Sequence, residues 1–138
     1  MIPNSQMIII ISSPSGAGKT SICKKLLQDD INLKISISDT TRIPRDNEID
    51  GKDYNFISLE SFKKKIKNNE YIEYASVFDN YYGSLNKNVL NILRDGFDVL
   101  FDIDWQGAKQ LKNSNYPNIL SFFIIPPSKE VIYNRLLS

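Results

Sequence analysis

Residues 7–20, MIIIISSPSGAGKT, join a β-branched apolar run to a glycine-containing turn that ends in Lys-Thr. The run from Met7 to Ser12 is typical of a strand buried on both faces of a parallel sheet. The turn follows the phosphate-loop pattern G-x-x-x-x-G-K-[ST] except at its first position, where Ser13 stands in place of glycine. Serine is acceptable there if its φ is negative and its side chain points away from the phosphates. The stretch therefore predicts a strand, a phosphate-binding loop and a helix.

The residue types in this loop suit an anion. Gly16 and Gly18 allow backbone N–H groups to converge on a phosphate, Lys19 supplies a mobile positive charge, and Thr20 offers a hydroxyl to a magnesium ion. These groups stand at the N-terminus of a helix, where the dipole favours negative charge. The alternative is a chance match, which has a probability of roughly 1% or less in a chain of this length.

The composition points to a single globular domain. The chain has 138 residues, 41% of them hydrophobic and 24% charged, which favours neither disorder nor a membrane span. A net charge of +1 gives no global field to recruit nucleic acid or an anionic membrane, so any anion needs a local cluster. With Cys23 as its single cysteine and no histidine, the chain has no intrachain disulfide and no imidazole chemistry. We expect a cytoplasmic protein.

Beyond the loop, the apolar periodicity alternates between helix and strand. A helix is expected over residues 19–30, then a half-exposed strand at 34–38 and a polar, turn-rich segment at 40–56. Further helices are expected at 58–69, 85–96, 105–114 and 128–137, and further strands at 71–78, 97–104 and 118–125. This order predicts an α/β fold, a parallel sheet covered by helices and interrupted by a small mixed insert.

Two carboxylates end the expected strand FDVLFDID. Asp102 lies where ligands bind in open α/β sheets, and Asp104 shares its side of the strand if the strand extends that far. Either residue could instead be a solvated strand end or the cap of the following helix. Together with a phosphate loop, they indicate a carboxylate for magnesium or substrate.

The turn-rich segment supplies a second cluster. Arg42 and Arg45 lie close together, and their guanidinium forks suit a phosphate dianion, although they could equally be surface arginines paired with Asp46 or Glu48. Tyr54, Tyr81 and Tyr82 are either phosphate-bonding hydroxyls or half-buried packing. Glu73 lies within the apolar stretch YIEYASVF, where it is either a residue of the wet face or a pair of acceptors for a ligand.

At these residues the sequence closely resembles the guanylate kinase family. The landmarks SSPSGAGKT, SDTTRIPRDNEIDGKDYNF, YIEYASVFDNYYGS, FDIDWQG and FIIPPS occur in the family's order and spacing from Met7 onward. The resemblance implies transfer of the γ-phosphoryl group of ATP to GMP or dGMP with Mg²⁺. It also implies a P-loop core over residues 1–33 and 85–138, with a GMP-binding insert over residues 34–84.

The resemblance assigns roles to individual residues. ATP would lie on Ser13, Pro14, Ser15, Gly16, Ala17, Gly18, Lys19 and Thr20, with Mg²⁺ at Thr20 and Asp102, directly or through water. GMP would be bound by Ser38, Glu73, Ser84 and Asp104 at the guanine and by Arg42, Arg45, Tyr54 and Tyr82 at the phosphate. Lys19, Arg42 and Arg45 would be the catalytic groups.

One departure from the family concerns the end of the chain. The family continues beyond the equivalent of YNRLLS into a lid with arginines and a segment near the adenine, so we expect this chain to be part of a longer protein. Two rivals to the kinase remain. One is a guanylate-kinase-like module that binds a phosphorylated peptide, and the other is a P-loop kinase with another acceptor. No nucleic-acid or membrane partner is expected.

Overall fold

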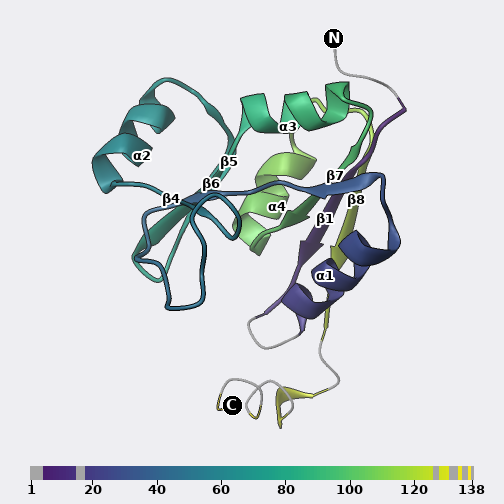
Figure 1. Cartoon of the computed structure of the whole chain (residues 1–138), viewed down its shortest axis with the longest axis horizontal. Coiled ribbons are helices and arrows are strands. Elements are labelled where there is room, and N and C mark those ends of the chain that lie inside the picture. Colours follow the sequence, from purple (N-terminus) through teal and green to yellow (C-terminus); the bar gives the residue numbers. More distant parts are fainter. Residues whose placement is uncertain (1–4, 15–17, 126–127, 131–133, 135–136, 138) are drawn as a thin grey trace.

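The computed structural model describes residues 5–14, 18–125, 128–130, 134 and 137, and these residues form two neighbouring sheets with their helices (Figure 1). The strands are β1 (Ile8–Ser12), β2 (Leu33–Ile35), β3 (Asp39–Thr40), β4 (Asn55–Phe56), β5 (Tyr71–Val77), β6 (Asn80–Leu85), β7 (Asp98–Asp102) and β8 (Ile119–Phe123). The helices are α1 (Lys19–Asp29), α2 (Leu59–Lys67), α3 (Asn86–Arg94) and α4 (Trp105–Lys112).

The first sheet has the order β2-β7-β1-β8, and all of its pairs are parallel. Alternate residues of its central strands face opposite sides, as the period of a strand requires. On β1, Ile8 and Ile10 pack against α3 and α4, whereas Ile11 faces α1 together with Leu100 of β7. The expected parallel α/β fold is therefore confirmed, with helices on both faces of the sheet.

The helices of both sheets begin and end as their residues dictate. Gly18 precedes α1 with a φ of 88°, a left-handed conformation that glycine adopts without steric cost. Gly96 follows α3 with a φ of 90°, which confirms the stop expected there. Ser58 caps α2 by accepting a hydrogen bond from the Ser61 N–H. Within the described ranges, no helix is both long enough and apolar enough to span a membrane.

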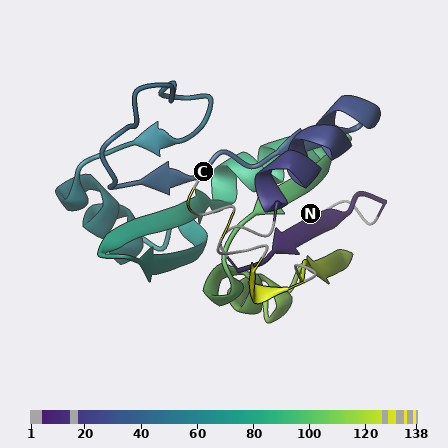
Figure 2. The same ribbon diagram turned by 90° about the horizontal axis from the view of Figure 1, so that it is seen from below.

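The second sheet forms the insert and has the order β4-β3-β6-β5. Seen from below, it stands beside the core sheet rather than on it (Figure 2). Helix α2 packs on it through the buried Phe62, whose ring stacks on Tyr71 at a centroid distance of 4.5 Å. Strand β6 was not expected from the sequence. It pairs with β5 through a tight turn in which Phe78 and Asp79 have φ values of 50° and 65°, the signs of a type I′ hairpin.

Two strand boundaries differ from those expected, and both bear on the site. The strand expected at 34–38 covers Leu33–Ile35 and pairs with β7, so it belongs to the core sheet. Strand β7 ends at Asp102, so Asp104 does not continue it. Of the helix expected at 128–137, residues 131–133, 135 and 136 lie outside the described residues.

Candidate active site

A cleft of about 580 Å³ lies between the carboxyl end of the core sheet and the insert. Its lining includes residues of the phosphate loop, of the end of β7 and of the insert. They are Ser13, Pro14, Gly18, Lys19, Thr20, Ser21, Ser38, Arg45, Tyr54, Glu73, Ala75, Val77, Phe78, Tyr82, Asp102, Ile103 and Asp104. Residues from distant parts of the sequence, from Ser13 to Asp104, thus share one cavity. Of the expected residues, Arg42 and Ser84 are not among those that line the cleft, and Ser15, Gly16 and Ala17 fall outside the described part of the chain.

The loop end of the cleft is anchored by backbone geometry. Ser13 is not among the described non-glycine residues with positive φ, so its backbone meets the condition for replacing glycine. Gly18 turns the chain so that α1 begins at Lys19, with its first N–H groups at the mouth of the cleft. Thr20 and Ser21 line the cleft from the same helical turn. An anion at this end would meet the positive end of the α1 dipole.

Lys19 is held by an acid and a carbonyl. Its Nζ lies 2.8 Å from Asp102 Oδ1 and donates to the Ile103 carbonyl over 3.3 Å. Both side chains of the ion pair are about one quarter exposed, so a ligand in the cleft can reach them. The lysine and the carboxylate therefore neutralise each other until anionic and cationic groups of a ligand replace them.

The donor set at this end fits magnesium brought by a ligand. The described residues include no group of three or more His, Cys, Asp or Glu side chains that could hold a metal ion by themselves. Mg²⁺ commonly binds one or two protein oxygens and completes its shell with water and substrate phosphates. The Thr20 hydroxyl and the Asp102 carboxylate line the same cleft and provide such oxygens.

Glu73 forms the insert side of the cleft. It is 3% exposed, and its Oε1 accepts a hydrogen bond from Ser84 Oγ over 2.6 Å. The two residues are direct partners across β5 and β6, and Ser38 Oγ lies 3.5 Å from Ser84 Oγ. Burial raises the pKa of Glu73 to about 7, against the lowering effect of the Ser84 hydrogen bond and with a further increase from the Asp104 charge. The carboxyl therefore titrates near neutral pH.

Helix α4 is shaped to receive this carboxyl group. Asp104 caps the helix, because its Oδ1 accepts from the Gly107 N–H over 3.1 Å. A Cβ on Gly107 would overlap Glu73 Oε2, so glycine at this position allows the acid to approach the helix. Asp104, which could have been a strand residue or a helix cap, is thus a cap, and it also lines the cleft.

Two glutamines of α4 bind the backbone of β5. Gln110 accepts from the Tyr74 N–H over 3.0 Å and donates to the Tyr74 carbonyl over 2.6 Å. Gln106 donates to the Ser76 carbonyl over 3.3 Å. The core helix therefore holds the strand that carries Glu73.

The far end of the cleft combines arginine and tyrosine. Arg45, Tyr54 and Tyr82 line it, and the rings of the two tyrosines are 5.8 Å apart. Arg42 lies over Tyr54, with its guanidinium carbon 5.4 Å from the centre of the ring. Tyr81, the third tyrosine considered from sequence, packs on Phe62 instead, with a centroid distance of 5.2 Å.

Sequence reasoning did not identify several of these contacts. Gly107 carried a usable signal, since glycine within a helical pattern often marks a close approach. The role of Gln110 carried none, because it depends on how the insert folds back on the core. The Lys19 contact with the Ile103 carbonyl also carried none, because it joins two segments of the core that lie far apart in the sequence. Arg42 pairs with Glu48, which was considered only as a surface alternative to phosphate binding.

Comparison with known proteins gives one consistent family. The family model described as guanylate kinase matches residues 5–138. The guanylate kinase of Rickettsia bellii is 54% identical over 136 residues, which cover 99% of this chain and 71% of the relative. That of Rickettsia felis is 50% identical, with 98% and 70% covered. The crystal structure of guanylate kinase from Anaplasma phagocytophilum superposes with a TM-score of 0.83 at 38% identity, covering 99% of this chain and 69% of that one.

Proposed function

The chain belongs to the guanylate kinase family and is an ATP-dependent GMP kinase, and we propose that the cleft of about 580 Å³ holds GMP against the insert and ATP against the loop. The observation that carries this assignment is Glu73, a carboxylate that is 3% exposed and shares a cleft with Lys19 and Asp102. Burying an ionised acid without a counter-charge costs free energy. A ligand that donates hydrogen bonds to this acid therefore gains binding free energy.

The guanine edge matches this acid. Guanine presents N1–H and the N2 amino group side by side, and an ionised Glu73 accepts from both. The Ser84 hydroxyl already donates to Glu73, so the Ser38 hydroxyl, 3.5 Å from Ser84 Oγ, is the one that donates to O6, and Asp104 lies at the same end of the cleft. Adenine offers an acceptor at N1 and no amino group at C2, so it leaves the carboxylate unpaired. The deoxy form dGMP carries the same edge and is accepted as well.

The GMP phosphate is assigned to the arginine and tyrosine end. Arg45, Tyr54 and Tyr82 line the cleft, and the Arg42 guanidinium lies over the Tyr54 ring at the same end. Guanidinium groups suit a phosphate dianion because they donate two parallel hydrogen bonds. Binding at both ends of GMP directs one phosphate oxygen towards the loop.

ATP is assigned to the loop end. Lys19, released from Asp102, neutralises charge on the ATP phosphates, and Gly18 and Thr20 lie beside them. Ser13 and Pro14 line the same end, and Ser15, Gly16 and Ala17 complete the expected set. Thr20 and Asp102 are the residues that would hold Mg²⁺, which supplies further neutralisation of phosphate charge when bound. A GMP phosphate oxygen attacks the γ-phosphorus, and ADP leaves. The reaction needs alignment and positive charge, which explains how it proceeds without a histidine base.

The test is acceptor selectivity. ADP release from ATP is measured in a coupled assay with GMP, dGMP, AMP and CMP side by side. We expect turnover with GMP and dGMP and little with AMP or CMP. Equal rates with AMP would indicate a P-loop kinase with another acceptor. Binding of a phosphorylated peptide without ADP release would indicate the binding module, which the retained Lys19 and Asp102 pair disfavours.

A further inference from the structure

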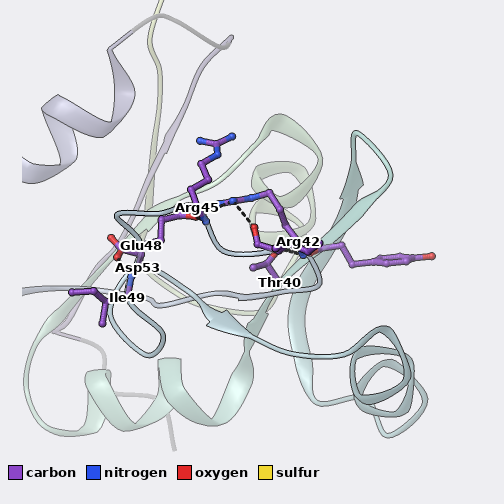
Figure 3. A network of polar contacts seen from close by, with 8 residues as sticks. Thr40, Arg42, Arg45, Glu48, Ile49 and Asp53 are labelled. Atoms are coloured by element: carbon purple, nitrogen blue, oxygen red, sulfur yellow. Dashed lines mark hydrogen bonds and ion pairs between the residues drawn. The ribbon is translucent and has the colours of Figure 1, made fainter.

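Glu48 lies at the centre of the loop that carries the two arginines (Figure 3). Its Oε1 and Oε2 accept from Arg42 Nη1 and Nη2, each over 2.8 Å. Oε1 also accepts from the backbone N–H of Arg45 over 2.8 Å. One carboxylate therefore contacts the side chain of one arginine and the backbone of the other.

The pairing with Glu48 fixes which part of Arg42 remains for a ligand. Arg42 has five N–H groups, and Nη1 uses both of its own on Glu48 and on the Ile43 carbonyl at 3.1 Å. Nη2 uses one on Glu48. The N–H of Nε and the second N–H of Nη2 then form the side of the fork, which is a geometry that binds a phosphate with two parallel bonds. Glu48 therefore occupies the end of the guanidinium and not its side.

The electrostatics keep this arrangement in place. The hydrogen bonds from Arg42, followed by that from the Arg45 backbone, lower the pKa of Glu48 to about 2, so it is ionised at any working pH. Hydrogen bonding to Glu48, with a smaller contribution from Tyr82, raises the pKa of Arg42. The Arg42 side chain is only 14% exposed, which limits the alternative positions open to it.

We propose that Glu48 is a positioning residue for the acceptor phosphate, because it orients the Arg42 fork and the Arg45 backbone before the phosphate arrives. This inference rests on the proposed function of the cleft. Its rival is that Glu48 competes with the phosphate for Arg42. The two hypotheses predict opposite effects of Glu48 on phosphate binding. A competitor weakens phosphate binding when present, whereas a positioning residue strengthens it despite its own negative charge.

The test compares Glu48→Gln with Asp53→Asn. Asp53 lies on the same loop and its Oδ2 accepts from the Ile49 N–H over 2.7 Å, but it touches neither arginine (Figure 3). Both substitutions remove one negative charge near the site, so Coulomb attraction alone would tighten GMP binding in both variants. Dissociation constants for GMP and for guanosine, which has no phosphate, are measured by titration calorimetry for each protein.

We expect Glu48→Gln to weaken GMP binding about 10-fold or more and to change guanosine binding less than 2-fold. Asp53→Asn should leave the ratio of the two affinities at the wild-type value. In an Arg42→Lys background the effect of Glu48→Gln should largely disappear, since an ammonium group has no fork to orient. A merely structural role would weaken both ligands equally and persist in that background.

Equal loss for GMP and guanosine, or tighter GMP binding by Glu48→Gln, overturns the proposal. A wild-type protein that binds GMP no better than guanosine contradicts the proposed function itself, which is a separate outcome. If thermal melting shows that Glu48→Gln does not fold, Glu48→Asp replaces it under the same criteria. That variant keeps the charge but shortens the reach to the two arginines.

Discussion

The two sheets of the molecule differ in how many polar groups they bury. The interior of the core sheet is apolar, with Ile8, Ile10, Val99 and Phe101 fully buried between strands and helices. The insert buries a polar set, namely Ser38, Asp39, Thr40, Glu73 and Ser84. Apolar burial stabilises a fold, whereas polar burial costs free energy unless every group is paired.

This difference indicates a division of roles between the core sheet and the insert. In the proposed function the core provides the edge at which Lys19 and Asp102 would meet the phosphates, so its interior needs only to be well packed. The insert has to present hydrogen-bonding groups to a base, and these must be buried before the base arrives. We therefore expect substitutions in the phosphate loop of the core to affect phosphoryl transfer. Substitutions in the insert should affect the choice and binding of the acceptor.

The largest expected effect tests the core side. Lys19→Ala removes the cation at the ATP phosphates and should lower kcat by about 10³-fold, while the dissociation constant for GMP stays nearly unchanged. Steady-state kinetics and calorimetry on the same preparation give both quantities. A fall in GMP affinity as steep as the fall in turnover would show that the two regions are not separable.

The next effect tests the insert side. Glu73→Gln keeps the size of the side chain but replaces one acceptor with a donor, so kcat/KM for GMP should fall by roughly 10²-fold or more while AMP is little affected. The exposed Glu70, three residues earlier, supplies the same substitution as a control. An unchanged ratio of GMP to AMP would mean that guanine is selected elsewhere.

A smaller effect concerns the stability of the insert. Asp39 is 1% exposed, and its oxygens accept from Asn55 over 3.0 Å and from Lys65 and Tyr71, each over 2.8 Å. Asp39→Asn removes the charge from this network and should lower the free energy of unfolding by about 2 kcal/mol.

The matched core change is Ile10→Val, which should cost about 1 kcal/mol through a small cavity. Chemical denaturation measures both variants. Since Ser38 adjoins Asp39, GMP affinity should fall for Asp39→Asn and stay constant for Ile10→Val. Loss of GMP affinity in both variants would contradict the division between the two regions.

The smallest effect is the pH dependence of base binding. The pKa of Glu73 is about 7 because of burial, and the charge of Asp104 adds to the increase. Guanine needs the ionised form, so guanosine affinity should fall about 10-fold for each pH unit below 7 and level off above it. Guanosine is the appropriate probe, because its lack of a phosphate removes the titration of that group. A flat profile for the wild type would contradict an acid of this pKa.

Ionisation of the same carboxyl group lowers the stability of the unliganded fold, whereas it favours guanine binding. Its pKa in the folded protein exceeds the ordinary value of 4.5, so the unliganded fold loses stability as the pH rises from about 4.5 to about 7 and does not regain it above. Glu73→Gln should therefore melt at a higher temperature than the wild type at pH 8 and at a similar temperature at pH 4. Stability and recognition are opposed at this residue.

The sequence predicted the core better than the insert, for physical reasons. A run such as Ile8–Ser12 followed by a glycine turn specifies strand and helix through local burial and backbone geometry. Strand β6 was missed because its residues, Asn80–Leu85, are strongly polar and aromatic without a clear period, and its pairing depends on the turn at Phe78 and Asp79. Neither residue is a glycine, so the usual hairpin signal was weak.

The site shows the same limit. The resemblance placed Lys19, Asp102, Glu73 and Arg45 in one site, and in the structure all four line the same cleft. Their assigned roles stay predictions. The sequence could not decide whether Arg42 paired with Glu48 or faced the cleft, since that depends on side-chain geometry within one loop. Contacts between a helix of the core and a strand of the insert are equally invisible to local patterns.

The glutamines of α4 have a consequence for how safely the chain folds. Strand β5 is the outer strand of its sheet, and the N–H and C=O of Tyr74 and the C=O of Ser76 point away from its partner β6. An outer strand with free backbone groups is a template on which a strand of another chain can add, and so it promotes aggregation. Gln106 and Gln110 occupy those groups, but they lie on a helix that comes after β5 in the chain. The outer strand is therefore open to intermolecular pairing until α4 has formed and docked, and closed to it afterwards.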